Sequence, residues 1–287
     1  MKLKNQIFLY ATHFYTKEIV TEFEKIKNAT RNLGVSLILY HRKSPGFVDH
    51  RKLQQPYYLF TDSKLSSLEY PTLVRKRLVP GSCHFPLMQF SRKHFFQYYW
   101  FIEYDVRFTG NWQDFFLYFE QANEDFLSSH IRRYSDEKDW SWWPTLWHPN
   151  KKIETSKMLR SFNPIYRISH AALHYIDSMH KKGWIGHNEV LYPTLLNLDG
   201  FKLRDFGGSG EFVLPKDKNR FYLESHSHPL INGTMRAINP HDLQISDEPK
   251  NKLVHPVKPG QKNLWSNVSR FKRMGYKSSV SRRNKGE

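Results

Sequence analysis

The sequence predicts an α/β fold with a mixed, mostly parallel central sheet flanked by helices in a single domain. Short apolar stretches, such as residues 35–41 and 98–102, alternate along the chain with amphipathic segments of helical spacing. This alternation is typical of βαβ units. The apolar stretches are nearly continuous, as expected for strands that are covered on both faces. A chain of 287 residues is also long enough to bury a substantial core.

The order of the elements follows from the same patterns. Strands are expected at residues 6–12, 35–41, 57–62, 98–102 and 125–131. Helices are expected at residues 16–34, 86–97, 111–122 and 169–183, and again from Asn188 onward. The first helix is the clearest example, because Ile19, Phe23 and Ile26 recur at helical spacing before Gly34 ends it.

Charge and cysteine content narrow the function. The net charge is +17, and residues 257–287 carry nearly half of it. A basic chain suits anionic ligands such as nucleotides. The single cysteine, Cys83, excludes an intramolecular disulfide bond and suits a reducing compartment. No apolar run approaches the roughly 18 residues of a membrane span, and the first twenty residues predict a core strand and not a signal peptide, so we expect a cytoplasmic protein.

One stretch, YYWFIEYDVRFTGNW at residues 98–112, places Glu103 and Asp105 at the end of an apolar strand. If the strand continues that far, the two carboxylates face the same side. Two like charges at one spot repel unless a cation lies between them. Because Mg²⁺ and Mn²⁺ prefer carboxylate oxygens together with phosphate oxygens, the pair predicts a metal that holds a diphosphate, with Arg107 as a further phosphate contact. The alternative is a solvated strand end in which Glu103 and Arg107 pair.

A second candidate site lies at residues 183–206, where Gly186-His187-Asn188-Glu189 precedes a helical pattern. Glu189 in the first turn is a candidate general base for an incoming hydroxyl. A helix dipole alone also favours an acid there, so both interpretations stay open.

A third candidate is the late segment NKLVHPVK. His255 follows a short apolar strand and can complete a divalent metal shell. Lys258 is close enough in sequence to reach a phosphate. His226 and His228, in ESHSHP, compete with His255 for the metal role.

The acid-x-acid pair, the acid in GHNE and the late histidine occur in an order that resembles GT-A type glycosyltransferases, which use nucleotide sugars on a Rossmann-related fold. The resemblance covers about residues 6–256, with Glu103 where such enzymes usually have aspartate. It implies that Glu103, Asp105 and His255 bind Mn²⁺ or Mg²⁺ and that Glu189 is the base of an inverting transfer.

The resemblance also implies a division of the chain and a set of ligands. Residues 1–122 would be the nucleotide-sugar half of the domain, 123–256 the acceptor half, and 257–287 a basic amphipathic tail. The donor would be a nucleoside-diphosphate sugar, with a UDP-sugar favoured, and the acceptor a glycan or a lipid-linked glycan. The donor is expected to contact Thr12, Asp62, Arg107 and Lys258.

Two further features have open interpretations. The segment at residues 139–149 concentrates four tryptophans, which could stack on an acceptor sugar or pack onto the core. In the tail, Leu264, Trp265, Val268 and Phe271 recur at helical spacing opposite cations, which suits an anionic membrane surface. The alternatives are a solvated extension and a tail that packs back across the acidic cleft. A metal-dependent hydrolase, a glycosidase and a single-strand nucleic-acid binder remain as rival functions, although clustering of the cations in the tail makes nucleic acid unexpected.

Overall fold

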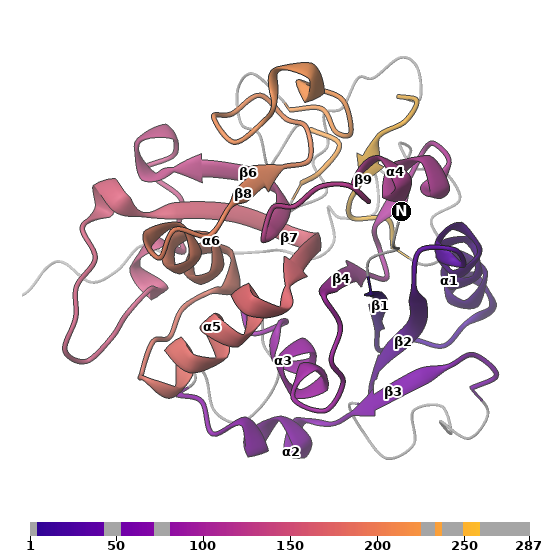
Figure 1. Cartoon of the computed structure of the whole chain (residues 1–287), viewed down its shortest axis with the longest axis horizontal. Coiled ribbons are helices and arrows are strands. Elements are labelled where there is room, and N and C mark those ends of the chain that lie inside the picture. The colour runs from indigo at the N-terminus through magenta and orange to yellow at the C-terminus, as the bar shows by residue number, and fades with distance from the viewer. Residues whose placement is uncertain (1–4, 43–52, 72–80, 225–232, 237–248, 259–287) are drawn as a thin grey trace, which may run out of the picture.

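A computed structural model of the chain describes residues 5–42, 53–71, 81–224, 233–236 and 249–258. Its main strands are β1 (Gln6–Thr12), β2 (Val35–His41), β3 (Tyr57–Phe60), β4 (Tyr98–Glu103), β6 (Phe126–Arg133), β7 (Leu159–Ser169) and β8 (Leu203–Asp205). They form one sheet in the order β3-β2-β1-β4-β7-β6-β8 (Figure 1). The first four strands are parallel, β7 is antiparallel to both neighbours, and β8 is parallel to β6. The predicted α/β class, with a mixed and mostly parallel central sheet flanked by helices in one domain, is confirmed.

Helices cover both faces of the sheet (Figure 1). They are α1 (Lys17–Thr30), α2 (Asp62–Leu65), α3 (Phe85–Ser91), α4 (Trp112–Tyr118), α5 (His170–Lys181) and α6 (Asn188–Leu198). Short 3₁₀ turns occur at Ser66–Leu68, Tyr134–Asp136, Trp143–Thr145, Thr155–Lys157 and Pro215–Asp217. In the described part of the chain, no helix is both long enough and apolar enough to cross a bilayer.

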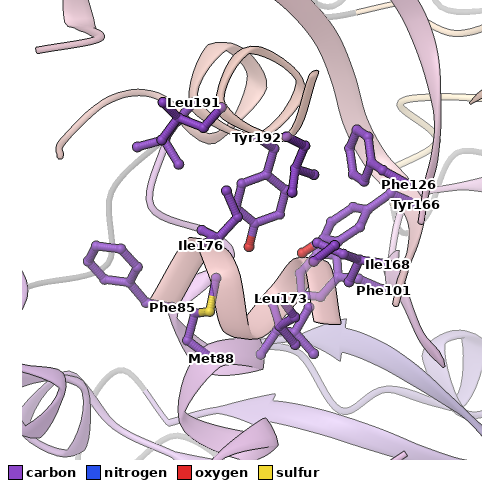
Figure 2. Close-up of a cluster of buried hydrophobic side chains, with 14 of the residues drawn as sticks. Phe85, Met88, Phe101, Phe126, Tyr166, Ile168, Leu173, Ile176, Leu191 and Tyr192 are labelled. Carbon is purple, nitrogen blue, oxygen red and sulfur yellow. The ribbon is translucent and has the colours of Figure 1, made fainter. Parts of the chain in front are cut away.

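Successive residues of the strands pack in two separate hydrophobic clusters, one on each face of the sheet. Trp100 and Ile102 of β4 pack in the cluster of α1 and α4, whereas Tyr99 and Phe101 pack in the cluster of α3, α5 and α6. Figure 2 shows part of the second cluster, in which side chains from the three helices meet Phe101 and its neighbours on the sheet. Burial on both faces explains why these strands read as continuous apolar runs.

A second, two-stranded sheet brings a distant segment to the end of β4. Strand β5 (Arg107–Phe108) pairs with β9 (Leu253–Val254) in antiparallel fashion. The amide of Val257 then donates to the carbonyl of Asp105 at 2.8 Å. Residues 255–258 are thereby held against the loop that follows β4.

The sequence patterns did not predict β7. Its residues LRSFNPIYRIS include two arginines, an asparagine and a proline, yet the whole strand is buried. Tertiary hydrogen bonds make this burial feasible. The guanidinium of Arg167, for example, donates to the carbonyls of Phe119, Ala122 and Glu124 at 2.8, 2.8 and 3.0 Å.

The helix expected at residues 86–97 was predicted too long, since α3 ends at Ser91. The backbone beyond it is held by a side chain of the next strand. The hydroxyl of Tyr99 donates to the carbonyl of His94 at 2.9 Å and accepts from the amide of Phe96 at 3.1 Å. These contacts are made by a residue of β4, so helical periodicity could not reveal them.

Candidate active site

A cavity of about 740 Å³ opens at the carboxyl ends of β1, β2 and β4. Its lining includes Thr12, His41 and Glu103, the last residues of those three strands. Glu189 and His255 line it from later parts of the chain. This is the place where open α/β sheets bind their ligands.

Three potential metal-ligating side chains converge beside this cavity. One ligand atom each from Glu103, Asp105 and His255 lies within 4.8 Å of the other two. Nε2 of His255 is 3.7 Å from Oε2 of Glu103 and 3.6 Å from Oδ1 of Asp105. The expected strand geometry is wrong, however, because β4 ends at Glu103 and a turn at 104–105 reorients the chain. The carboxylates meet through this turn and not through strand alternation.

The donor set fits a divalent cation. Oδ1 of Asp105 is buried and has no hydrogen-bond partner among the described residues. Nδ1 of His255 lies 2.8 Å from the carbonyl oxygen of Arg236, and because a carbonyl only accepts, Nδ1 carries the proton. In the neutral ring this leaves the Nε2 lone pair facing the two carboxylates. A histidine fixed by a carbonyl in this way is the usual arrangement for metal ligation.

The electrostatics of the cluster also favour positive charge. Burial alone would raise the pKa of Asp105, but His255 and Lys258 outweigh it and hold that pKa below its usual range. Burial opposes protonation of His255, yet the charges of Asp105 and Glu103 raise its pKa to about 9. The ammonium group of Lys258 contacts Oδ2 of Asp105 and lies 3.4 Å from the hydroxyl of Tyr104.

Glu189 lies in the first turn of α6, and its Oε2 is 3.6 Å from Nδ1 of His187. The ring of His187 caps this helix by accepting from the Glu189 amide at 3.3 Å. Among the described residues, Oε1 of Glu189 accepts one hydrogen bond, from the backbone N–H of Asn163 at 3.2 Å. Burial raises the pKa of Glu189 to about 7; Glu103 adds to the rise, while Asn163, Arg160 and His255 oppose it. A carboxyl group that titrates near neutral pH is suited to proton transfer.

Gly81 packs against the first residues of α6. Its φ is +90°, a conformation that side chains disfavour. A Cβ there would approach Cδ2 of His187 to 2.6 Å. The carbonyl of Gly81 accepts from the amide of Asn188 at 2.9 Å. The close packing at Gly81 therefore positions the helix turn that carries Glu189.

Of the four residues expected to contact the donor, two line the cavity and two do not. Thr12 and Lys258 line the cavity. Arg107 does not line it; its guanidinium is directed to α1, with contacts of 3.5 Å to both Glu18 and Glu22. Asp62 also lies outside the lining, in α2 and not in the expected strand.

Asp62 still acts next to the cavity, because it lies 2.9 Å from Nε2 of His41, which does line it. The competing candidates His226 and His228 lie outside the described residues, as does the tail beyond Lys258. In the sheet order, β3, β2, β1 and β4 come from before residue 122, and β7, β6 and β8 come from after it. The assignment of a nucleotide-sugar half and an acceptor half to these two parts stays a prediction.

Sequence reasoning missed Asn163, and it gave no role of their own to His187 and Trp142, which lie in segments that it had singled out. Asn163, on the strand that was not predicted, is the hydrogen-bond partner of Glu189. His187 and Trp142 line the cavity and their rings stack at 4.7 Å. In the tryptophan cluster at 139–149, Trp143 is buried and so packs onto the core, whereas Trp142 lines the cavity, and its stacking on an acceptor sugar stays a prediction. The density of aromatic residues in this cluster was the signal that could have located Trp142.

Comparison with known proteins adds fold-level likenesses. No family model matches this chain, and no curated protein matches it. Among solved structures, it is similar to glucosyl-3-phosphoglycerate synthase from Mycobacterium tuberculosis in complex with Mn²⁺, UDP-glucose and phosphoglyceric acid, at 12% identity over 70% of this chain and 69% of that one, with a TM-score of 0.40. It is also similar to an inositol-1-phosphate CTP transferase from T. maritima, at 11% identity over 76% and 92% of the two chains, with a TM-score of 0.38. TM-scores below 0.5 carry no argument about function, which has to come from this chain's own residues.

Proposed function

We propose that this chain is a metal-dependent glycosyltransferase of the GT-A type, which moves a sugar from a nucleoside-diphosphate donor to a hydroxyl group of an acceptor. The observation that carries the proposal is the convergence of Glu103, Asp105 and His255 at the carboxyl end of β4. Two carboxylates and one imidazole beside a large cavity form a donor set for Mn²⁺ or Mg²⁺. Such an ion, when bound, would neutralise the charge of the donor diphosphate.

The chain's own groups add to phosphate binding. Lys258 lines the cavity and its ammonium group is already directed at Asp105. A cation in this position can contact a diphosphate oxygen as well as the carboxylate. Thr12 lines the same wall at the end of β1 and supplies a hydroxyl group.

Glu189 is the proposed base. Its carboxylate accepts the proton of the acceptor hydroxyl as that oxygen forms a bond to the anomeric carbon. The bond from this carbon to the diphosphate oxygen breaks, and the nucleoside diphosphate leaves with the electron pair. This direct displacement inverts the anomeric configuration. Burial of Glu189 supports the assignment, because a raised pKa makes its carboxylate a stronger base.

The donor we propose is a UDP-sugar, and the acceptor is a hydroxyl group on a glycan or lipid-linked glycan. The charge of +8 on residues 257–287 supports a peripheral contact with an anionic membrane. Truncation after Lys258 should then reduce cosedimentation with anionic vesicles at low salt. Equal binding of the truncated and full-length proteins would contradict the membrane contact.

The experiment that tests the proposal is a donor screen with two readouts. Purified protein is incubated with a panel of UDP-, GDP- and CDP-sugars, with Mn²⁺ or with a chelator, in the presence of pooled glycan acceptors. Release of nucleoside diphosphate and the fate of the labelled sugar are both measured. Metal-dependent release with the label on an acceptor is expected. Label found only as free sugar would contradict transfer and indicate a hydrolase.

A further inference from the structure

A second hollow lies on the connection between β6 and β7, outside the catalytic cavity. It encloses about 430 Å³ and is lined chiefly by aromatic and aliphatic side chains. Small-ligand sites have volumes of roughly 300–1,000 Å³ and this kind of lining. Trp184 is buried at its base, whereas Trp147 is 52% exposed at its rim.

The backbone around this hollow is fixed from two sides. Trp147 and Ile185 exchange backbone hydrogen bonds of 2.9 and 3.0 Å. The amide of Asn150 donates to Nδ1 of His148 at 3.0 Å, while Nε2 of the same ring lies 2.9 Å from the carbonyl oxygen of Lys182. These two contacts leave His148 as a neutral tautomer with its proton on Nε2. The backbone that carries the exposed indole of Trp147 is therefore held in place by these hydrogen bonds.

The charge at the rim has one sign. Lys151 and Lys152 line the hollow and are exposed. Neither forms an ion pair with a described residue, and the lining contains no carboxylate among the described residues. By contrast, the neighbouring Lys157 lies outside the lining and is 3.5 Å from Glu154. Aromatic faces bind the C–H faces of rings, and paired ammonium groups bind carboxylates or phosphates.

The hollow is close in the chain to the catalytic cavity. Trp142, which lines that cavity, precedes Trp147 by five residues, a separation of at most about 18 Å even in a fully extended chain. The hydroxyl of Thr145, between them, accepts from the amide of His187 at 3.0 Å. One short segment therefore presents an indole to each site, and Thr145 ties that segment to the residue that caps the catalytic helix.

We propose that this hollow is a subsite for an anionic saccharide, with a sugar ring on Trp147 and its carboxylate or phosphate group on Lys151 and Lys152. As an acceptor subsite it rests on the proposed function: it would hold a distal acidic sugar of the acceptor chain while a hydroxyl group of a nearer sugar reaches Glu189. The saccharide binding itself depends only on the second hollow.

Calorimetric titration without donor or metal tests the proposal. Tetragalacturonate and a phosphorylated mannose tetrasaccharide supply the two anionic groups, and methyl-esterified tetragalacturonate is the neutral match. At least one anionic saccharide should bind the full chain, about tenfold more tightly than the ester. Absence of binding by both, or equal affinity for acid and ester, would overturn the proposal.

Variants assign the binding to the hollow. Trp147→Ala and the double variant Lys151→Gln/Lys152→Gln should each weaken binding about tenfold, and the double variant should also lose most of the salt dependence. Lys157→Gln is the matched control and should bind as the unmodified chain does. Unchanged affinity in the lysine variant, whose surface positions do not threaten folding, would overturn the assignment.

Turnover separates this inference from the proposed function. With an anionic acceptor, the lysine variant should have a raised KM and an unchanged kcat. If the protein transfers sugar to small acceptors but binds none of the saccharides, the subsite proposal is wrong and the proposed function is unaffected. If the protein binds a saccharide but transfers sugar to no acceptor, the proposed function and the acceptor role of the hollow are both wrong, and the hollow is a saccharide-binding site only.

Discussion

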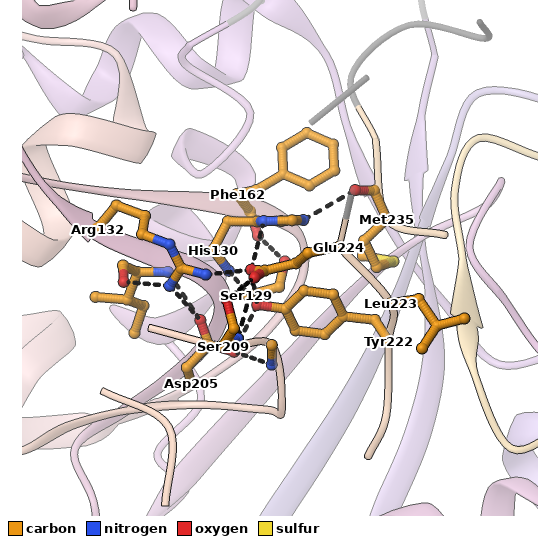
Figure 3. Close-up of polar contacts among 12 residues, drawn as sticks. Ser129, His130, Arg132, Phe162, Asp205, Ser209, Tyr222, Leu223, Glu224 and Met235 are labelled. Carbon is orange, nitrogen blue, oxygen red and sulfur yellow. Dashed lines mark hydrogen bonds and ion pairs between the residues drawn. The ribbon is translucent and has the colours of Figure 1, made fainter. Parts of the chain in front are cut away.

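Two carboxylate clusters in this protein differ in how completely their oxygen atoms are hydrogen-bonded: the cluster around Asp205 and Glu224, and the candidate active site. In the cluster of Figure 3, Oδ1 of Asp205 accepts from the amide of Gly207 at 3.0 Å and from the hydroxyl of Tyr222 at 2.8 Å. Its Oδ2 accepts from the amide of Ile131 at 2.9 Å. In the candidate active site, Oδ1 of Asp105 has no such partner among the described residues.

The two glutamates show the same contrast. Glu224, in Figure 3, contacts Arg132, His130 and Ser209, and these partners outweigh burial and lower its pKa to about 2. The side chain of Glu189 is also largely shielded from solvent, but it accepts a single hydrogen bond from the described residues, and its pKa rises to about 7. A cluster whose carboxylates are saturated with partners stabilises the fold, whereas one with an open carboxylate oxygen retains the capacity to bind a ligand or exchange a proton.

The largest expected effect is on catalysis. Glu189→Gln should lower kcat by about 10²–10⁴-fold, the usual contribution of a general base, and leave donor affinity unchanged. In the unmodified chain, kcat should rise with pH through about 7, as Glu189 loses its proton. Steady-state kinetics across pH 5–9 measures both. The control is Glu154→Gln, which changes an exposed glutamate paired with Lys157. Equal activity of the Glu189→Gln variant and this control would contradict the assignment of Glu189 as the base.

The next effect concerns stability in the saturated cluster. Asp205→Asn places an NH₂ group where Oδ2 now accepts from the Ile131 amide, and it removes a charge next to Arg132. We expect a loss of about 3 kcal/mol in the free energy of unfolding, with unchanged kcat per folded molecule. Urea unfolding of this variant and of the exposed control Asp114→Asn measures the loss. Equal stability of the two variants would contradict the structural role.

An effect of similar size is a gain of stability at the unsaturated site. The pKa of Glu189 is about 7 in the folded chain against an ordinary value of 4.5, so the folded state binds more protons between these values. Stability is therefore lost as pH rises from about 4.5 to 7, by roughly 3 kcal/mol. Glutamine does not ionise and carries no such penalty. As pH rises through that window, the free energy of unfolding of Glu189→Gln should therefore increase relative to that of the unmodified chain, and at pH 8 the variant should have the higher unfolding midpoint. A pH-independent difference would contradict the burial of an ionisable carboxyl group.

The sequence predicted most of the parallel half of the fold, because β1, β2 and β4 are apolar runs that are buried on both faces. It could not predict β7, whose burial depends on partners contributed by other segments. Arg167 and Asn163 look like surface residues until the partners of their side chains are placed. The partners of Arg167 are backbone carbonyls, and those of Asn163 include the hydroxyls of Ser128 and Ser161. Periodicity carries no information about such tertiary partners.

The candidate site was predicted in part for the wrong local reason. Glu103 and Asp105 were expected to converge through strand alternation, but a turn after Glu103 brings them together. Arg107 was expected at a phosphate, and its partners on α1 could not be identified from spacing along one strand. His255 depends on the pairing of β5 with β9, a contact between segments more than 140 residues apart in the chain.

Metal-dependent nucleotide binding by Asp105→Asn tests the central claim most directly. Asparagine keeps the shape of Asp105 but removes the negative charge of its carboxylate, whose Oδ1 faces His255 and Glu103. Calorimetric titration of UDP and GDP, with Mn²⁺ and with a chelator, compares the unmodified chain, Asp105→Asn and the exposed control Asp114→Asn; circular dichroism checks that each is folded. We predict that Mn²⁺ tightens nucleotide binding at least tenfold in the unmodified chain and the control, and not in Asp105→Asn. Equal metal dependence in all three proteins, or nucleotide binding that ignores the metal throughout, would contradict the account.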